Sequence, residues 1–385
     1  MKAFSMLIFF LIVLSVYSLV NCYIFIRGWH GLEFYPSLRP YYLGLFIFLF
    51  LAYIIARISE RFGHSAITEI LNWSGSFWFA AMLYFFLIIL LLDLIRMANH
   101  FVHFMPAGFY IAYAKTKFIT MMIVFGLVIV LIVYGYINAS IVRIKTLDIT
   151  INKTVKNHNS LNIVMLSDLH LGTIIGPNKL GRIVEKINTL HPDIVLLVGD
   201  VVDENIKPVI KKNMGSLLEN IKTKYGVYAI TGNHEFIGGV GPAVAYLEKH
   251  KVQFLRDTAI LIDSAFWVVG RNDKDMVRFT GKKRMELDEL MKTVDTSYPI
   301  ILLDHQPFNL EKAAQAGVDL QLSGHTHNGQ MFPLNYITRA IYHPDWGYRK
   351  INETQFYVSC GVGTWGPPVR IGNQPEIVNL RLSFK

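Results

Sequence analysis

The sequence predicts an α/β domain that follows a four-helix transmembrane region. Hydrophobic residues are concentrated in the first 142 residues, whereas the remainder has the composition of an ordinary globular domain. In that remainder, short apolar runs alternate with segments of helical periodicity. Strands that alternate with helices are typical of layered α/β domains. We therefore expect two domains, at residues 1–142 and 143–385.

Four apolar runs in the first part approach the length of a membrane-spanning helix, which is about 20 residues. They cover residues 3–26, 41–57, 75–95 and 118–137. The first run resembles a signal peptide, but Asn21 stands where a cleavage site needs a small residue. One such run could be a buried core helix. Four in succession predict four membrane spans, the first of them a retained anchor.

The positive charges that flank the spans bear on the orientation. With four spans, both ends of the region lie on the same side of the membrane. The basic residues on that side are Lys2, Arg57, Arg61, Arg143, Lys145, Lys153 and Lys156, and those on the other side are Arg27, Arg39, Arg96, Lys115 and Lys117. The excess of seven over five favours a multi-pass protein of the cell membrane with a cytoplasmic C-terminal domain.

The overall charge and the cysteines exclude several functions. A net charge of +9 suits anionic lipid surfaces or phosphate-bearing substrates. The basic residues are too dispersed to predict nucleic-acid binding. With only Cys22 and Cys360, the chain can form neither a disulfide framework nor a cysteine-rich metal site. No sequence feature identifies a protein partner.

Five strand-like runs in the second part end in polar residues. The runs cover residues 161–167, 193–198, 228–230, 300–303 and 318–322. Helical segments are predicted at 178–190 and near 207–223, after the first and second runs. In open α/β folds, ligands bind at the carboxyl ends of the strands. Side chains from five strand ends are therefore expected to converge on one pocket.

The residues at these strand ends are carboxylates, imidazoles and amides, which can bind metals. In chain order they are Asp168-Leu169-His170, Gly199-Asp200, Gly232-Asn233-His234-Glu235, Asp304-His305 and Gly324-His325-Thr326-His327. Each motif alone is weak, because a strand-terminal aspartate often caps a helix and a Gly-Asn pair often forms a turn. An extended backbone would point His325 and His327 to the same side. The five motifs together predict a metal site.

These motifs match the order D-x-H, G-D, G-N-H-[DE], H and G-H-x-H. Residues 160–383 thereby resemble the calcineurin-like metallophosphoesterases, and within them the bacterial membrane-associated type with N-terminal transmembrane helices. The chain's end, with Tyr357-Val358-Ser359-Cys360-Gly361 and Pro367-Pro368-Val369-Arg370, also matches that type. The resemblance implies a four-layer α/β/β/α sandwich with two divalent metal ions.

The resemblance also implies a role for each motif residue. The first ion would be held by Asp168, His170, Asp200 and His327, and the second by Asp200, Asn233, His305 and His325. Asp200 would bridge the ions, and His234 would act on the leaving-group oxygen. Mixed imidazole and carboxylate ligands suit Mn, Fe or Zn. A pair of such ions can hold a bridging hydroxide and clamp the phosphoryl oxygens.

Other residues are candidates for supporting roles. Glu235 could orient His234, and Asp203 could accept a hydrogen bond from an imidazole N–H, unless it is an ordinary loop acid. Arg370 could contact the substrate phosphate, or be a surface arginine. Residues 331–350 are both aromatic and basic. They could form a lid or a membrane-facing lip, or a packed loop over the edge of the sandwich.

The predicted function is hydrolysis of a phosphodiester or pyrophosphate-type bond by a metal-bridging hydroxide. A membrane tether would hold the site near membrane lipids, which favours a lipid-linked substrate. The alternatives are a phosphodiesterase for soluble nucleotides and a non-catalytic metal-binding scaffold or sensor in the membrane. Every ligand and His234 are present, which argues against the scaffold. Transport by the spans is disfavoured because they lack a pathway of paired charges.

Overall fold

The computed structural model describes the chain except for residues 1, 63–64, 107–111 and 156–157, and for residues 2–7, 9, 10, 61 and 62 it describes only the backbone. Lys156, which we counted in the orientation argument, lies outside the described residues. Contacts divide the chain into two compact units, residues 1–135 and 136–385. The domain boundary at residues 142 and 143 stays a prediction.

The first unit is helical, as expected. Its helices are α1 (Lys2–Gly31), α2 (Arg39–Phe62), α3 (Ala66–Val102) and α5 (Tyr113–Ser140), with short 3-10 turns at Leu32–Phe34 and Pro36–Leu38. In the part of the chain that the structure describes, four helices are long and apolar enough to cross a membrane. The prediction of four long apolar helices is thereby confirmed. Helix α3 is longer than the predicted run because hydropathy marks only its apolar centre. Its first turn is capped by the Ser65 hydroxyl, which accepts from the Thr68 N–H at 3.2 Å.

Polar side chains within the helical unit bind one another. Asp93 lies 2.6 Å from Arg27 and 3.3 Å from Arg96, and the Trp78 indole donates to the Asn21 side chain at 2.9 Å. Lipid offers no partner to polar groups, so a spanning helix has to satisfy them within the protein. These contacts give the polar side chains partners within the helical unit.

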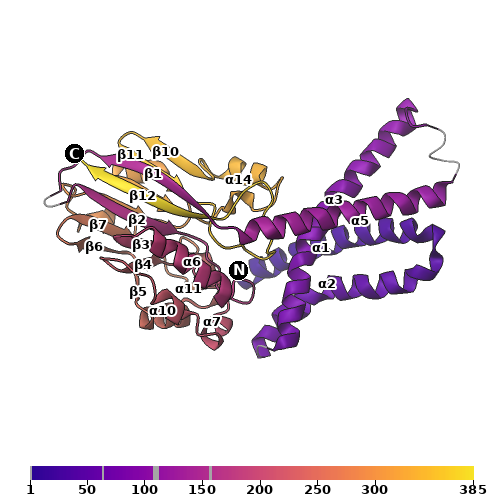
Figure 1. Cartoon of the computed structure of the whole chain (residues 1–385), viewed down its shortest axis with the longest axis horizontal. Helices are drawn as coiled ribbons and strands as arrows, with labels where there is room; N and C mark the ends of the chain where they lie inside the picture. The colour runs from indigo at the N-terminus through magenta and orange to yellow at the C-terminus, as the bar shows by residue number, and fades with distance from the viewer. Residues whose placement is uncertain (1, 63–64, 107–111, 156–157) are drawn as a thin grey trace. The chain divides into compact units, whose positions relative to one another are not determined.

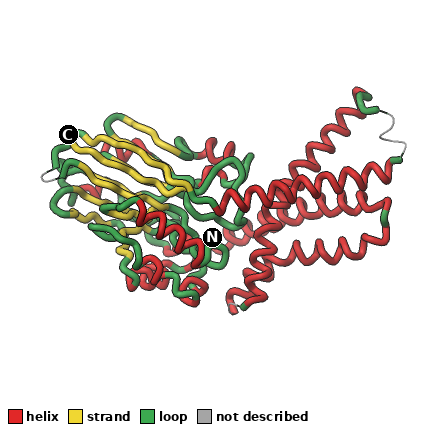
Figure 2. The backbone as a smooth tube through the Cα atoms, viewed as in Figure 1, coloured by secondary structure: helices red, strands yellow, loops and turns green. Residues whose placement is uncertain are grey.

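The second unit contains two six-stranded sheets (Figures 1 and 2). The first sheet has the order β1 (Arg143–Ile151), β12 (Glu376–Phe384), β2 (Ser160–Leu166), β3 (Ile194–Val198), β4 (Val227–Ile230) and β5 (Val252–Phe254). The second has the order β10 (Gly347–Ile351), β11 (Thr354–Val358), β9 (Leu320–Ser323), β8 (Ile300–Leu303), β7 (Phe266–Gly270) and β6 (Thr258–Ile262). All five predicted strands are present.

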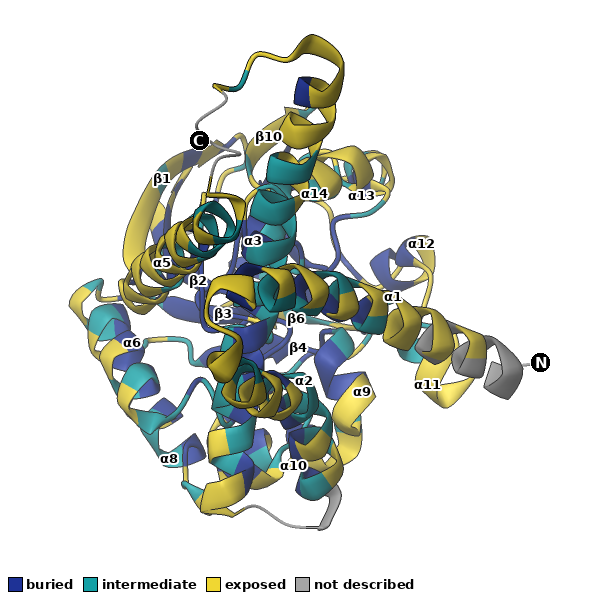
Figure 3. Cartoon of the chain, turned by 90° about the vertical axis from the view of Figure 1, so that its right-hand side faces the viewer, coloured by how far each residue is buried: buried dark blue, intermediate teal, exposed yellow. Residues whose placement is uncertain are grey.

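Helices cover the outer face of each sheet. The first sheet packs against α6 (Pro177–Thr189), α7 (Lys207–Lys211), α8 (Gly215–Leu218) and α10 (Val240–Lys249), and the second against α12 (Leu287–Met291) and α13 (Leu310–Gln315). A third apolar core lies between the sheets, where Ile163 of β2 and Ile301 of β8 are fully buried. Figure 3 shows β2, β3 and β4 in the colour of buried residues. The predicted α/β/β/α sandwich is confirmed.

Parallel pairing brings the strand ends together. In the first sheet, β2 pairs with β3 and β3 with β4, all parallel. In the second sheet, β7, β8 and β9 are parallel neighbours. The motifs that follow β2, β3, β4, β8 and β9 therefore emerge at the carboxyl edges of the two facing sheets.

The predicted helix near 207–223 is wrong in its length. The chain forms α7 and α8 instead, because Asn213 between them has a left-handed φ of +47°. A Cβ at Gly215 would also overlap the His250 ring, so the close approach of these segments requires glycine there. Local periodicity does not reveal either constraint.

Candidate metal centre

The motif residues leave their strands through left-handed turns. The φ angles are +54° at Asp168, +50° at His170, +51° at Asp200, +73° at His325 and +49° at His327. Non-glycine residues rarely adopt such angles, and each costs on the order of 1 kcal/mol or more. Their concentration at the ends of β2, β3 and β9 shows that the fold holds these side chains in place at a cost in stability.

This geometry corrects the expectation that His325 and His327 extend from one straight segment. Because both residues have positive φ, the backbone turns between them. His325 Nδ1 lies 2.9 Å from Asn233 Oδ1, whereas His327 Nε2 lies 3.1 Å from His170 Nε2. The two imidazoles thus belong to different clusters of side chains, as the family resemblance implies.

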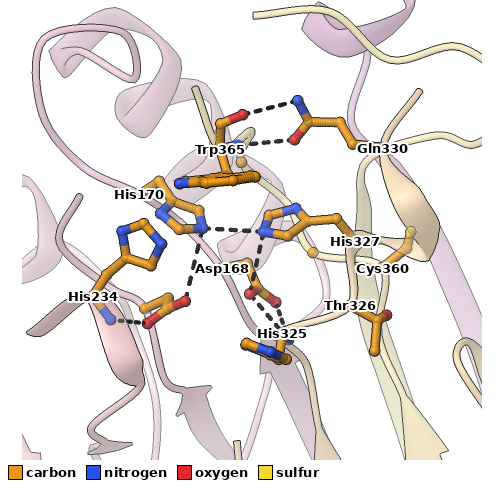
Figure 4. Close-up of polar contacts among 12 residues, drawn as sticks. Asp168, His170, His234, His325, Thr326, His327, Gln330, Cys360 and Trp365 are labelled. Carbon is orange, nitrogen blue, oxygen red and sulfur yellow. Dashed lines mark hydrogen bonds and ion pairs between the residues drawn. The ribbon is translucent and has the colours of Figure 1, made fainter. Parts of the chain in front are cut away.

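The first cluster consists of Asp168, His170 and His327 (Figure 4). His327 Nε2 lies 3.4 Å from Asp168 Oδ1 and 3.1 Å from His170 Nε2. His170 Nε2 is also 4.0 Å from Asp200 Oδ2. One potential ligand atom of each cluster member lies within 4.8 Å of the others, so these three residues could hold one metal ion.

The second cluster consists of Asp200, His305 and His325, with Asn233 beside it. His305 Nε2 lies 3.1 Å from Asp200 Oδ2, the same oxygen that faces His170. The other oxygen of Asp200 accepts the backbone N–H of His234 at 2.8 Å. Asp200 therefore lies between the two clusters, which is where a bridging ligand would have to be.

The chemistry of His305 fits a cation. Its Nδ1 donates to the Val198 carbonyl at 2.8 Å, because a carbonyl can only accept. Among the described residues, no hydrogen-bond partner is recorded for its buried Nε2, although this atom faces the Asp200 carboxylate. Burial alone would lower the pKa of His305, but the Asp200 charge raises it well above its usual value. A divalent ion would take the place of that proton between the two groups.

Two other imidazoles are held in the neutral form that metals bind. Burial and the nearby His305 charge lower the pKa of His325 to about 3. Burial, with His170 and Arg370 nearby, lowers the pKa of His327 well below its usual value. Neither ring would have to lose a proton at neutral pH to bind a cation.

Glycines make room for the carboxylates. A Cβ at Gly232 would overlap Asp200 Oδ1, and a Cβ at Gly324 would overlap Asp168 Oδ2. Both glycines directly precede motif residues. Their role is thus steric: they let the backbone pass close to the candidate ligands.

His234 and Asp203 lie beside the first cluster. Asp203 Oδ1 is 3.2 Å from His234 Nδ1 and 3.5 Å from His170 Nδ1, so a single carboxylate oxygen faces both rings. Glu204, whose Oε1 is 3.8 Å from His234 Nδ1, adds negative charge there. Burial would lower the pKa of His234, but the Asp200 and Asp203 charges raise it to about 9. These carboxylates therefore favour the protonated form of His234.

Glu235 has contacts other than those expected. Its carboxylate accepts the backbone N–H groups of Gly232 at 2.7 Å, Val202 at 2.9 Å and Asp200 at 3.1 Å. Burial, with the Asp200 charge, raises the pKa of Glu235 to about 7. The side chain ties the turn after β3 to the turn after β4, and so holds Asp200 through the backbone rather than by orienting the His234 ring.

Arg370 is fully buried behind His327. Its guanidinium donates to the carbonyls of Cys360 at 2.7 Å and Gly363 at 2.8 Å, and one nitrogen lies 3.4 Å from His327 Nδ1. That nitrogen of His327 is on the opposite side of the ring from the first cluster. The phosphate contact stays a prediction, but the geometry favours a role in supporting the His327 loop.

Asparagines also fasten the His327 loop. The Asn373 amide donates to the backbone carbonyls of His327 at 3.2 Å and Asn328 at 3.0 Å. The Asn138 amide, in the last turn of α5, donates to the carbonyls of Asn373 at 2.7 Å and Arg370 at 3.0 Å. All of these residues belong to the second unit. The end of helix α5 is therefore hydrogen-bonded to the segment that supports a candidate ligand.

Exposed apolar side chains follow the His327 motif along the chain, and one more, Trp365, lies beside the site. We call this set the apolar rim: Phe332, Tyr336, Ile337, Ile341, Trp346 and Trp365. Most come from helix α14 (Asn335–Ile341), which has no buried residue, and its flanks. Trp365 is 55% exposed, and its ring centroid is 6.2 Å from that of His234. Gln330 holds the Trp365 backbone through bonds of 2.8 and 3.0 Å (Figure 4).

Some residues near the clusters carry no signal in the sequence. Asp273 is fully buried and accepts from the Gln306 amide at 2.9 and 3.0 Å. Burial raises its pKa to about 6, although the His305 charge opposes this. Glu204 could have been suspected because it follows Asp203, and Gln306 because it follows His305. Asp273 and Trp365 lie in no motif and are brought to the site only by the fold.

Comparisons with known proteins agree with this geometry. The family model for calcineurin-like phosphoesterases matches residues 161–329. An uncharacterized metallophosphoesterase of Campylobacter jejuni is 30% identical over 98% of this chain and 99% of its own length. A relative in Helicobacter pylori with the same description is 35% identical over 62% of this chain and 64% of its own. A bovine transmembrane protein with metallophosphoesterase domain is 34% identical, and the match covers 66% of this chain and 60% of the relative.

Proposed function

The chain belongs to the calcineurin-like metallophosphoesterases, a family of phosphoester hydrolases, and from this premise we propose that it cleaves phosphodiester or pyrophosphate-type bonds of lipid-linked substrates. The observation that carries the proposal is the pair of side-chain clusters that meet at Asp200. The apolar rim beside them supports the choice of a lipid-linked substrate.

Two divalent ions, Mn, Fe or Zn, would be held by the motif residues. We propose Asp168, His170, Asp200 and His327 for the first ion, and Asp200, Asn233, His305 and His325 for the second. When bound, such a pair supplies an activated water and neutralises charge on the phosphoryl oxygens. Because Asn233 is a neutral amide, it adds no negative charge that would repel a phosphate.

The remaining site residues move a proton and hold positions. We propose that protonated His234 donates a proton from Nε2 to the leaving oxygen, since its Nδ1 faces Asp203 at 3.2 Å. Asp203 would keep the His234 and His170 rings in place together. Glu235 would keep Asp200 in place through its three backbone hydrogen bonds.

The apolar rim supports a substrate with a hydrophobic chain. Tyr336 and Ile337 are about as exposed as Trp365, at 60% and 57%. Contiguous exposed apolar side chains on a protein surface mark sites for lipids or protein partners. Arg339, Arg349 and Lys350 lie in the same segment, and cations suit anionic headgroups. Membrane lipids are therefore the partner that we propose for this surface.

The test compares two phosphodiesters with the same p-nitrophenyl leaving group, one esterified to a methyl group and one to a dodecyl chain. The full chain in detergent, supplied with Mn, is expected to hydrolyse both, with kcat/KM about tenfold higher for the dodecyl ester. An advantage of that size is about 1.4 kcal/mol, less than full burial of one large apolar side chain provides. Trp365→Ala is expected to reduce this advantage severalfold.

A matched control and the alternatives complete this experiment. Phe279→Ala removes another exposed aromatic side chain, in helix α11 (Met276–Thr280), and should leave the preference unchanged. Faster turnover of thymidine 5′-(p-nitrophenyl phosphate) than of the dodecyl ester would favour the nucleotide phosphodiesterase. Metal binding without hydrolysis of any of the three esters would favour the scaffold or sensor.

We further propose that the protein is a multi-pass membrane protein whose catalytic unit is cytoplasmic. The flanking Lys and Arg residues support this orientation. Fluorescence of a C-terminal green fluorescent protein fusion in a bacterial host would agree with it. Activity of an alkaline phosphatase fusion at the same position would reverse it.

A further inference from the structure

A second polar cavity lies at the carboxyl ends of β7 and β8. It has a volume of about 320 Å³. Its lining includes Arg271, Lys274, Arg284, Asp304, Phe308 and Lys312. Asp304 precedes the candidate ligand His305, but Asp304 contacts Arg271 and Arg284, whereas His305 contacts the Val198 carbonyl and Asp200. The cavity is therefore separate from the two metal clusters and shares a strand with them.

Positive charge is in excess in this cavity. Arg271, Lys274, Arg284 and Lys312 oppose Asp304 and Glu286, which leaves a formal charge of +2. Asp304 is shared, at 2.9 Å from Arg271 and 2.7 Å from Arg284. Arg271 is only 8% exposed, and its buried Nε has no hydrogen-bond partner in the described part of the chain. An unpaired buried donor of this kind calls for an acceptor.

Lys274 is the cation that is free to meet a ligand. Among the residues that the structure describes, none forms a hydrogen bond or an ion pair with its ammonium group. The Nζ atom lies 3.2 Å from the centroid of the Phe308 ring. Asp273 and Asp275 lie near enough to act on it electrostatically, and Arg278 and Arg284 oppose them. The ammonium is thus held over a ring at the cavity, with no carboxylate bound to it.

A wall of aromatic rings joins this cavity to the metal clusters. The Phe308 ring, under Lys274, is 4.8 Å from the Tyr342 ring, and Tyr342 is 5.8 Å from the candidate ligand His325, as measured between ring centroids. An extended substrate could follow this wall with one phosphate at the metal clusters and another anionic group at the cavity.

Resting on the proposed function, we propose that the cavity lined by Arg271, Lys274, Arg284 and Lys312 binds a second phosphate group of the substrate, beyond the bond that is cleaved. Arginine and lysine together supply the donors that a phosphate needs. The terminal nitrogens of Arg271 and Arg284 already donate to Asp304 and to backbone carbonyls, so the Arg271 Nε–H and the Lys274 ammonium are the donors that we assign to the phosphate. Substrates with one phosphate would lack this contact and bind more weakly. The preferred substrates are therefore phosphodiesters or pyrophosphates that carry an additional phosphate.

The test uses thymidine 5′-(p-nitrophenyl phosphate) with and without a 3′-phosphate, so that only the second anion differs. For the full chain with Mn, we expect KM to be about tenfold lower for the 3′-phosphorylated ester, a difference of about 1.4 kcal/mol. Lys274→Gln should abolish most of that difference in KM. It should leave kcat for both esters, and KM for the ester without a 3′-phosphate, unchanged. This variant leaves no carboxylate without its partner.

The same substitution on a remote surface is the control. Lys249→Gln, on helix α10, removes one exposed positive charge outside the cavity and should keep the preference for the 3′-phosphate. Equal KM values for the two esters in the unmodified chain would overturn the proposal. So would a preference for the 3′-phosphorylated ester that is as strong in Lys274→Gln as in the unmodified chain.

A binding measurement separates this proposal from the proposed function. The Lys274 ammonium has no hydrogen bond or ion pair in the described part of the chain, so acetylation of its amine can report on a ligand in the cavity. Acetylation of the full chain is followed by mass spectrometry with and without 10 mM pyrophosphate. Slower acetylation of Lys274, with Lys249 unaffected, would support the cavity as an anion site even if no ester is hydrolysed. Unchanged acetylation of Lys274 would overturn it even if the esters are cleaved.

Discussion

Asp200→Asn is expected to lower kcat for phosphodiester hydrolysis about a thousandfold or more, which is about 4 kcal/mol of transition-state stabilisation. The two side-chain clusters meet at this carboxylate, since one oxygen faces both His170 and His305. An amide has the same shape but no charge, so it would hold two cations poorly. The bound metal, measured by inductively coupled plasma mass spectrometry, should fall by at least one ion per chain.

The control for this prediction is Asp148→Asn on strand β1, because Asp148 is exposed and lies in no cluster. It should keep both metal content and kcat. Similar melting temperatures of the two variants with metal removed would show that neither substitution unfolds the chain. Full metal content and full activity in Asp200→Asn would contradict the assignment of Asp200 as the shared ligand.

His234→Gln is expected to act on the leaving group and not on metal binding. His234 contributes its backbone N–H to Asp200, and glutamine keeps that bond. The Asp200 and Asp203 carboxylates favour the protonated form of its ring, and Asp203 Oδ1 lies 3.2 Å from its Nδ1. General acids of this kind contribute about a hundredfold to ten-thousandfold when the leaving oxygen needs a proton. We therefore expect a loss of about a thousandfold for an alkyl leaving group, but only about tenfold for p-nitrophenolate.

Metal content should stay at the level of the unmodified chain, which distinguishes this variant from Asp200→Asn. His158→Gln is the matched control, since His158 is paired with Asp263 at 3.1 Å and takes no part in the clusters. An equal loss for both leaving groups would rule out proton donation and leave charge stabilisation as the role of His234.

The sequence predicted the parts of the site that depend on local order. Each motif follows an apolar run directly, so the strand and the candidate ligands could be recognised together. The neighbouring positions of Asp168 and Asp200 at the ends of β2 and β3 follow from parallel pairing, which the alternation of strands and helices predicts. His305 follows β8 in the second sheet, and the packing of the two sheets brings it to them. The two clusters therefore involve residues that the motifs had named.

Other features depend on contacts between distant segments, which periodicity does not report. Arg271 and Arg284 meet Asp304 across 33 and 20 residues of chain. Arg370 can be buried because the turns around Gly363 point backbone carbonyls at its guanidinium. The left-handed φ angles at His325 and His327 were not predicted, because a histidine in the sequence does not indicate a positive φ as a glycine often does.

The hydrogen bonds of Asn138 have a practical consequence for preparing a water-soluble enzyme. A fragment cut at the predicted domain boundary would begin at Arg143 and lose the amide that holds the Arg370 and Asn373 carbonyls. It would also lose the Ala139 carbonyl, which accepts from Lys179 at 2.9 Å. Truncation is therefore better placed at Tyr136, so that the last helical turn remains as an N-terminal clasp on the loop that carries His327.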